Sequence, residues 1–210
     1  MGAGVTQGTL DLSDVSISDL DNGIVVTEDA EVTLNQFLIE RCRDTGIILQ
    51  SGRLTYLGGK IQDCGVGAML GDETRWPEIT ASASLEAVQI SRCASYAIAA
   101  YSGPVRLTDL DISECMYGIY VHGPPKEASA KNNPAGANSE TEPGAGKRNS
   151  QDSPAVEVSA ENIRFSKLQK VAVLARGDCR VKHHGLEIDP KSSFEAAVAV
   201  GGAEISAANP

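Results

Sequence analysis

Hydrophobic and polar positions follow one short pattern that recurs along the chain. The segment ISECMYGIYVHG (residues 112–123) has an isoleucine, two polar residues, a cysteine, a glycine and a short apolar run. Related segments begin at Ile17, Ile39, Ile61, Ile90 and Phe165. With residue 112 included, the leading residues are spaced by 22, 22, 29, 22 and 53 positions. A fixed period of this size is the signature of a repeat architecture.

The apolar stretches within each repeat are short and are bounded by Gly, Asp, Asn and Ser, as in GIVV (23–26), GIIL (46–49) and GIYV (118–121). No stretch sustains an apolar spacing of i, i+3, i+4, i+7, so the pattern favours strands and tight turns over helices. One repeat is too small to bury its own apolar face, so it must stack on its neighbours about 4.8 Å away. We therefore predict an all-β solenoid.

Two spacings exceed the period, and each excess predicts an insertion. The first falls in residues 71–83, which we predict to be a loop. The second falls in residues 124–154, which are rich in Pro, Gly, Ser, Asn and Glu and cannot bury enough surface to offset their ordering entropy. We predict coils one to five over 1–123, a disordered insertion over 124–154, and the final coils and tail over 155–210.

The repeats resemble those of the right-handed parallel β-helix proteins of the pectin-lyase-like group, which often follow I-x-x-C/N-x-x-x-G-I-x-V. The resemblance covers most of the chain outside 124–154 and implies a right-handed parallel β-helix of about seven coils, roughly 30 Å long. A leucine-rich repeat would need leading leucines and a helix-forming half that this chain lacks. The group includes lyases, hydrolases, epimerases, tailspikes and non-catalytic eukaryotic modules, so the fold alone does not define the function.

Four of the five cysteines occupy one position of successive repeats, namely Cys42, Cys64, Cys93 and Cys115. Leu20 and Leu168 take this position in the outer repeats, which favours a buried packing role. A metal site would favour local C-x₂-C pairs, and disulfides would favour an oxidising compartment. The chain has no such pair and no visible secretory signal, so we expect free thiols and an intracellular (cytoplasmic) location.

A second column, two residues after each leading residue, alternates in charge: Asp19, Arg41, Asp63, Arg92, Glu114 and Lys167. If the repeats stack in register, each charge lies beside opposite charges on the neighbouring strands. Such pairs each contribute a few tenths of a kcal/mol and help to fix the register. We expect these residues to have a structural role, with chance as the alternative.

The sequence offers no catalytic set, and we expect no metal and no cofactor. The motifs N-T-D, D-D and D-P-H-D of enzymes with this fold are absent. The best candidates for binding are the acidic residues Asp11, Asp14 and Asp21 near the N-terminus. A further candidate is Trp76, beside Arg75 in the 71–83 segment, because an exposed Trp can anchor a partner or stack on a sugar. Local packing is the alternative for Trp76.

The formal net charge of −10 over 210 residues argues against nucleic acid as a partner and favours a protein with a basic surface. No apolar run reaches the 18 residues of a membrane span. We expect a non-catalytic module for protein–protein interaction or scaffolding. The alternatives are a carbohydrate-active protein, either enzyme or glycan binder, and a protein that self-associates through the ends of the solenoid.

Overall fold

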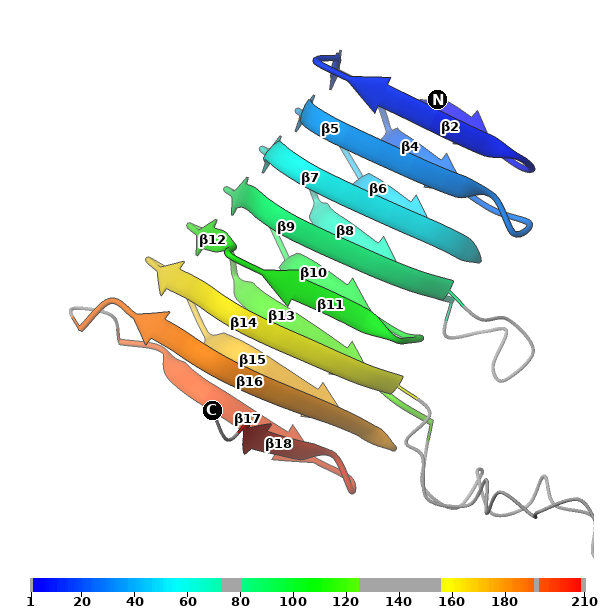
Figure 1. Cartoon of the computed structure of the whole chain (residues 1–210). Coiled ribbons are helices and arrows are strands. Elements are labelled where there is room, and N and C mark those ends of the chain that lie inside the picture. The colour runs from blue at the N-terminus through cyan, green and yellow to red at the C-terminus, as the bar shows by residue number, and fades with distance from the viewer. Residues whose placement is uncertain (1, 73–80, 125–155, 191–192, 209–210) are drawn as a thin grey trace, which may run out of the picture.

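The computed structural model describes residues 2–72, 81–124, 156–190 and 193–208. Within these residues the chain forms strands and turns and no helix, which confirms the predicted all-β class. The strands make two large parallel sheets that lie face to face (Figure 1).

Sheet A, the rear layer in Figure 1, contains the shorter strands. Their spatial order is β1 (Ala3–Val5), β4 (Asn22–Val26), β6 (Thr45–Leu49), β8 (Val66–Leu70), β10 (Tyr96–Ala100), β13 (Tyr117–His122), β15 (Val171–Arg176) and β17 (Glu195–Val200). Every described pairing in this sheet is parallel.

Sheet B, the front layer, contains the longer strands (Figure 1). Their order is β2 (Thr9–Ser13), β5 (Glu31–Glu40), β7 (Gly52–Gln62), β9 (Ala81–Ser91), β11 (Val105–Thr108), β14 (Val156–Ser166), β16 (Cys179–Ile188) and β18 (Glu204–Ala207). Two short strands continue this sheet: β3 (Ser16–Ser18) pairs with β5, and β12 (Asp111–Ser113) pairs with β9 and β14.

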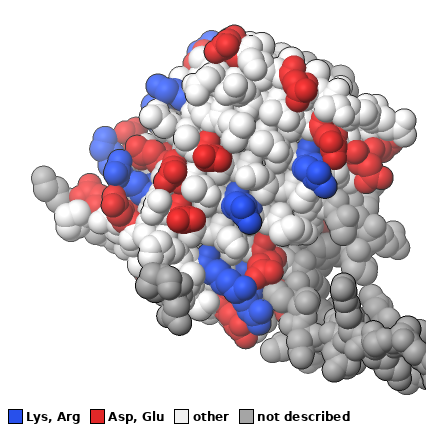
Figure 2. All heavy atoms as spheres, in the orientation of Figure 1, with Lys and Arg blue, Asp and Glu red and all other residues white. Residues whose placement is uncertain are grey.

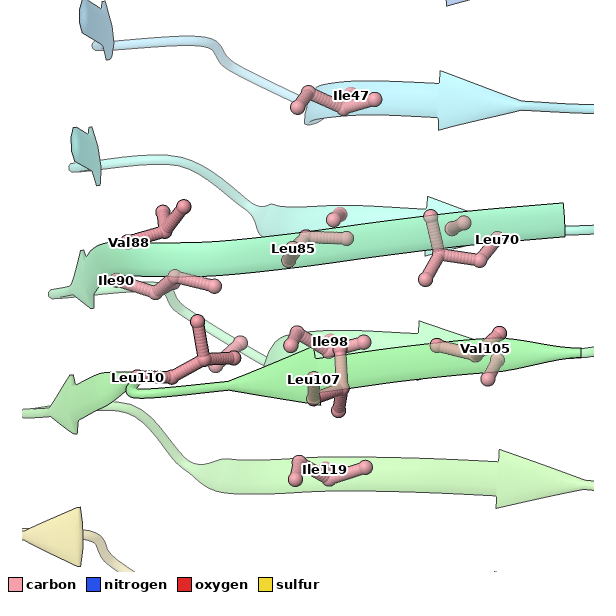
Figure 3. Packing of buried hydrophobic residues seen from close by; sticks show 14 of the residues in the cluster. Ile47, Leu70, Leu85, Val88, Ile90, Ile98, Val105, Leu107, Leu110 and Ile119 are labelled. Carbon is pink, nitrogen blue, oxygen red and sulfur yellow. The ribbon is translucent and has the colours of Figure 1, made fainter. Parts of the chain in front are cut away.

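The leading residues of the repeats form one column of sheet B, because each pairs with the next across neighbouring strands: Ile17, Ile39, Ile61, Ile90, Ile112, Phe165 and Ile188. From Ile39 to Phe165 their side chains are fully buried. The core lies between the two sheets and consists mainly of aliphatic residues, as Figure 3 shows for Ile98, Leu107 and Ile119. The largest buried side chains are Tyr56, Phe37 and Phe165.

Two columns of residues with left-handed backbone conformation bend the chain, one along sheet B and one directly after its strands end. The first is Asp14, Gln36, Gly58, Ala87, Asp109, Asn162 and Gly185, with φ between 50° and 65°. The second, five residues later, is the column of alternating charges, with φ between 51° and 60°. Since this conformation costs a non-glycine residue about 1–2 kcal/mol, the stacked neighbours must hold it in place.

A glycine precedes the apolar run in four strands of sheet A, at Gly23, Gly46, Gly67 and Gly118, and allows these strands to pack closely against their neighbours. A Cβ atom at Gly46 would lie 2.6 Å from the carbonyl oxygen of Gly67 and 2.9 Å from Cγ2 of Ile61. The first contact requires the backbone to shift and the second requires the buried Ile61 side chain to shift. At Gly46 the glycine is therefore a packing requirement.

The predicted loop over 71–83 is too long at its end, because β9 begins at Ala81. Ala81 and Ala83 are buried, whereas Ser82 and Ser84 face outward, so these residues do alternate as a strand should. Their small size hid that alternation in the sequence. Residues 73–80 of this insertion and residues 125–154 of the second lie outside the described residues.

Candidate functional site

The alternating charges line the bend that follows the leading residues, where they form ion pairs between neighbouring strands. The Nε atom of Arg41 lies 2.8 Å from Oδ1 of Asp19, and that of Arg92 lies 2.7 Å from Oδ1 of Asp63. The Nζ atom of Lys167 lies 3.0 Å from Oε1 of Glu114. The six residues are thus joined as three successive pairs.

Two of the pairs lower the pKa of their carboxyl groups. Hydrogen bonding from Arg41 lowers the pKa of Asp19 to about 2, and hydrogen bonding from Arg92 lowers the pKa of Asp63. Among the described residues no direct ion pair joins Arg41 to Asp63, although the charge of Arg41 further lowers the pKa of Asp63. Because these side chains are largely exposed, each pair contributes little alone.

The four aligned cysteines are buried and have free thiols. All four thiols donate to the carbonyl two residues earlier, for example Cys64 to Gln62 (3.3 Å) and Cys115 to Ser113 (3.2 Å). Burial raises the pKa of Cys42 to about 12 and also raises that of Cys64. Protonated, buried thiols of this kind are poor nucleophiles and poor metal ligands. Within the described residues, no group of three or more His, Cys, Asp or Glu is arranged to hold a metal ion.

The structure does not bring the acidic candidates together. Asp11 faces outward from β2 on sheet B, and Asp14 lies at the first bend. Asp21 lies beyond the second bend, where its carboxylate is 2.7 Å from Nη2 of Arg43. These residues therefore form no common acidic site. Trp76 and Arg75 lie outside the described residues.

The outer face of sheet B carries two adjoining shallow depressions. One, of about 390 Å³, is lined chiefly by Arg53, Ser84, Arg106, Glu157 and Ser159. The other, of about 360 Å³, shares Arg53 with it and adds Asp29 and Glu31. The short outward side chains of β9 create the floor, because Ser82 and Ser84 lie between longer residues on the neighbouring strands.

Charges of both signs are interspersed over this face, as Figure 2 shows. Many are paired across neighbouring strands: Arg53 with Glu31 at 3.3 Å, Lys182 with Glu157 at 2.7 Å, and Arg180 with Glu204 at 3.0 Å. Arg106 has no ion pair among the described residues. The sheet B depressions therefore offer hydroxyl groups and one unpaired guanidinium in a setting of nearly balanced charge.

The outer face of sheet A has a different chemistry. The described strands β1, β4, β6, β8, β10 and β13 contain no Asp, Glu, Lys or Arg. Their outward column, continued by β15 and β17, is apolar throughout: Gly4, Val25, Ile48, Met69, Ala99, Tyr120, Leu174 and Val198. None of these residues belongs to the core cluster between the sheets. We call this surface the sheet A face.

An aromatic cluster occupies the middle of the sheet A face. The ring of Tyr96 stacks on those of Tyr117 and Tyr120, with centroids 5.1 and 4.8 Å away. Tyr101 meets Tyr120 edge-on at 6.0 Å. The Nζ atom of Lys170 lies 5.4 Å from the centroid of Tyr117, within cation–π range. Except for the buried Tyr120, these tyrosines are half-buried.

Sequence reasoning missed the sheet A face. The signal was present, because the outward residue of every G-I-x-V segment is the apolar x, where a strand with one solvated face would carry polar residues. The four tyrosines also fall in two successive repeats.

Comparison of the chain with protein-family models, with characterised proteins and with solved structures finds no match. In the part of the chain that the structure describes, no helix is long and apolar enough to cross a membrane. The case for a function therefore rests on the surfaces of this molecule.

Proposed function

We propose that this chain is a right-handed parallel β-helix, similar to the pectin-lyase-like group, that acts as a non-catalytic protein-interaction module in an intracellular (cytoplasmic) protein. About seven coils of about 22 residues agree with the spacing of the leading residues and with their pairing across sheet B. The sheet A face is its binding surface.

The observation that carries this proposal is the contrast between the two faces. Sheet B bears mixed charges, many of them paired, whereas six successive described strands of sheet A bear none. Contiguous apolar surface on a soluble protein typically marks an interaction site. Tyrosines add to this, because they are enriched among the residues that dominate binding energy at interfaces.

Two matched lysine substitutions separate the faces. Met69 lies at the centre of the sheet A face, and Thr55 lies in the larger sheet B depression. Both side chains point outward and are half-buried, so Met69→Lys and Thr55→Lys add the same charge at comparable sites. Wild type and both variants would be used as baits in an extract of cells that produce the protein.

A supporting result has two parts. A protein must be retained by wild type and Thr55→Lys but lost with Met69→Lys, and the purified candidate must then bind the purified chain with the same dependence. A candidate that is lost with Thr55→Lys instead would place binding on sheet B and refute the proposal.

The sheet B depressions favour a second candidate function, the binding or cleavage of a carbohydrate. Hydroxyl groups of Ser82, Ser84 and Ser159 lie there beside Arg53 and Arg106, and a carboxylate is supplied by Glu157. The test is a panel of acidic and neutral polysaccharides, with and without Ca²⁺, read by thermal shift and by release of new chain ends. Turnover that Thr55→Lys abolishes would make the protein an enzyme and overturn the first proposal.

A further inference from the structure

We infer that the partner on the sheet A face is a second copy of this chain, bound face to face across a two-fold axis. This inference rests on the proposed function, because it names the occupant of the same surface. Three features of the face support it: its lack of charge, its area and its self-complementary shape.

Charge restricts where two copies can meet. The chain carries a net charge of −10, so most surfaces would place like charges in contact. Charged residues on the strands of the sheet A face are confined to Arg176 and Glu195, on the last two strands described. Two copies can therefore bury the rest of the strands of this face with Lys170, beside the ring of Tyr117, as the further charge at its border.

The area is sufficient for a stable dimer. The strands of this face average about five residues, which span about 17 Å, and eight parallel strands span about 34 Å. The face thus covers about 570 Å² per copy, or about 1,100 Å² in total, above the roughly 1,000 Å² that a specific interface needs. Two sheets packed in this way would lie about 10 Å apart.

The order of residues along the face fits a two-fold axis that lies in the interface, parallel to the strands and between β8 and β10. Such an axis places each strand opposite the one at the same distance on the other side, because four strands lie on each side. The residues then opposed are Met69 and Ala99, Ile48 and Tyr120, Val25 and Leu174, and Gly4 and Val198. Gly4 faces the larger Val198, and the flexible Met69 lies over Ala99. Ala99 and Tyr120 are already buried within the chain, so they form the floor of the face and do not project from it.

Sedimentation velocity of the full chain over a concentration series tests this inference. The mass should rise from 22.0 kDa toward twice that value. Met69→Lys, which brings two lysines together near the axis, should weaken the dimer at least tenfold, whereas Thr55→Lys should leave it unchanged. High salt should preserve or strengthen association, since the interface is apolar and not ionic.

A monomer at every concentration would overturn the inference, as would a dimer that Thr55→Lys disrupts and Met69→Lys does not. These results are separable from failure of the proposed function. If the chain is monomeric but Met69→Lys still loses a different protein, the sheet A face binds a different partner and only the second-copy inference fails. If Met69→Lys affects neither self-association nor partner binding, both fail. Circular dichroism of each variant checks that the fold is intact.

Discussion

Arg41 and Asp19, 22 residues apart in the chain, form a two-point ion pair across neighbouring strands. The Nε and Nη2 atoms of Arg41 donate to Oδ1 and Oδ2 of Asp19 at 2.8 and 2.9 Å. Arg41 also bonds to Glu40, and its charge reaches Asp63 on the next strand. This pair connects the sequence repeat to its physical role, because a shift of one residue in register would separate the two ions. Asp19 would then lie opposite the uncharged Cys42 or the like-charged Glu40.

Reversing the charge of Arg41 tests that role. Arg41→Glu would place three acidic side chains in succession, at positions 19, 41 and 63. The urea midpoint of unfolding should fall. Lys60→Glu is the matched control, because it makes the same change of charge on sheet B at a residue without an ion pair among those described. Equal losses for both variants would mean that net charge, and not the pairing, determines the effect.

The ion pair of Asp19 and Arg41 also predicts that the stability of the fold depends on pH. Asp19 has a pKa of about 2 in the folded chain, against about 3.9 when unfolded, mainly because Arg41 donates hydrogen bonds to it. A lowered pKa stabilises the fold above the unfolded value, and this contribution is lost as the pH falls through about 2. Asp19→Asn should therefore be less stable than wild type at about pH 6, and this difference should disappear as the pH falls through about 2. A difference that persists at the acid end would argue against the ion pair as its source.

Ala87→Gly should stabilise the protein. Ala87 is exposed and has a φ of 55°, which a residue with a Cβ adopts at a cost of about 1–2 kcal/mol. Glycine removes that cost but gains entropy in the unfolded chain, so we expect a net gain of about 1 kcal/mol. Ser84→Gly, on the same strand in extended conformation, should instead lose about 0.5–1 kcal/mol. Chemical denaturation measures both, and a loss at Ala87 would contradict the role assigned to the bend.

Gly46→Ala should destabilise the protein by about 1–3 kcal/mol, because the added methyl group would meet the carbonyl oxygen of Gly67 at 2.6 Å. The column continues as Ala97 and Ala172 farther along the sheet, where the strands do accommodate a Cβ. The reverse change, Ala97→Gly, should cost only about 1 kcal/mol or less. Similar losses at both positions would mean that close strand approach does not explain the glycine.

The cysteines should react with thiol reagents only when the protein unfolds. All five side chains are buried, which excludes a reagent from the thiols. Burial also raises the pKa of Cys42 to about 12 and raises that of Cys64, so these two form almost no thiolate at about pH 8, whereas a hydrogen bond with Cys93 lowers the pKa of Cys115. A colorimetric disulfide reagent should modify all five cysteines in urea and none rapidly in the native state. Rapid modification of the native chain would show that the aligned cysteines are accessible to reagents and would contradict their assignment as buried packing residues.

Most of the fold could be predicted because the repeat places the same residue types at equivalent positions. The leading isoleucines and the charges of alternating sign both define a register, and the strands pair in that register. The left-handed backbone of the second bend could not be predicted from the sequence, since residue types such as Arg41 and Lys167 do not favour that conformation. The first bend did leave a signal, because Asp, Asn and Gly recur in its column at Asp14, Asn162 and Gly185.

The candidate site was harder to predict, for a physical reason. A charged or aromatic residue such as Asp11 or Trp76 can be recognised on its own in a sequence. A binding face, in contrast, is made of residues that several repeats contribute to one side of a sheet. In the sequence, the residue at position x of each G-I-x-V segment is apolar like its two neighbours, so it reads as one more buried residue. Only the alternation of Ile24 and Val26 inward with Val25 outward shows that x belongs to the surface.

We propose that the sheet A face, and not sheet B, is the binding surface. Hydroxyl-radical footprinting distinguishes the two faces, because Met and Tyr side chains are readily oxidised and report their own exposure. Met69, Tyr96 and Tyr101 should become protected when the chain is concentrated or bound to a partner, while the exposed Leu57 on sheet B should not change. Protection of Leu57 with unchanged oxidation of Met69 and the tyrosines would contradict the account.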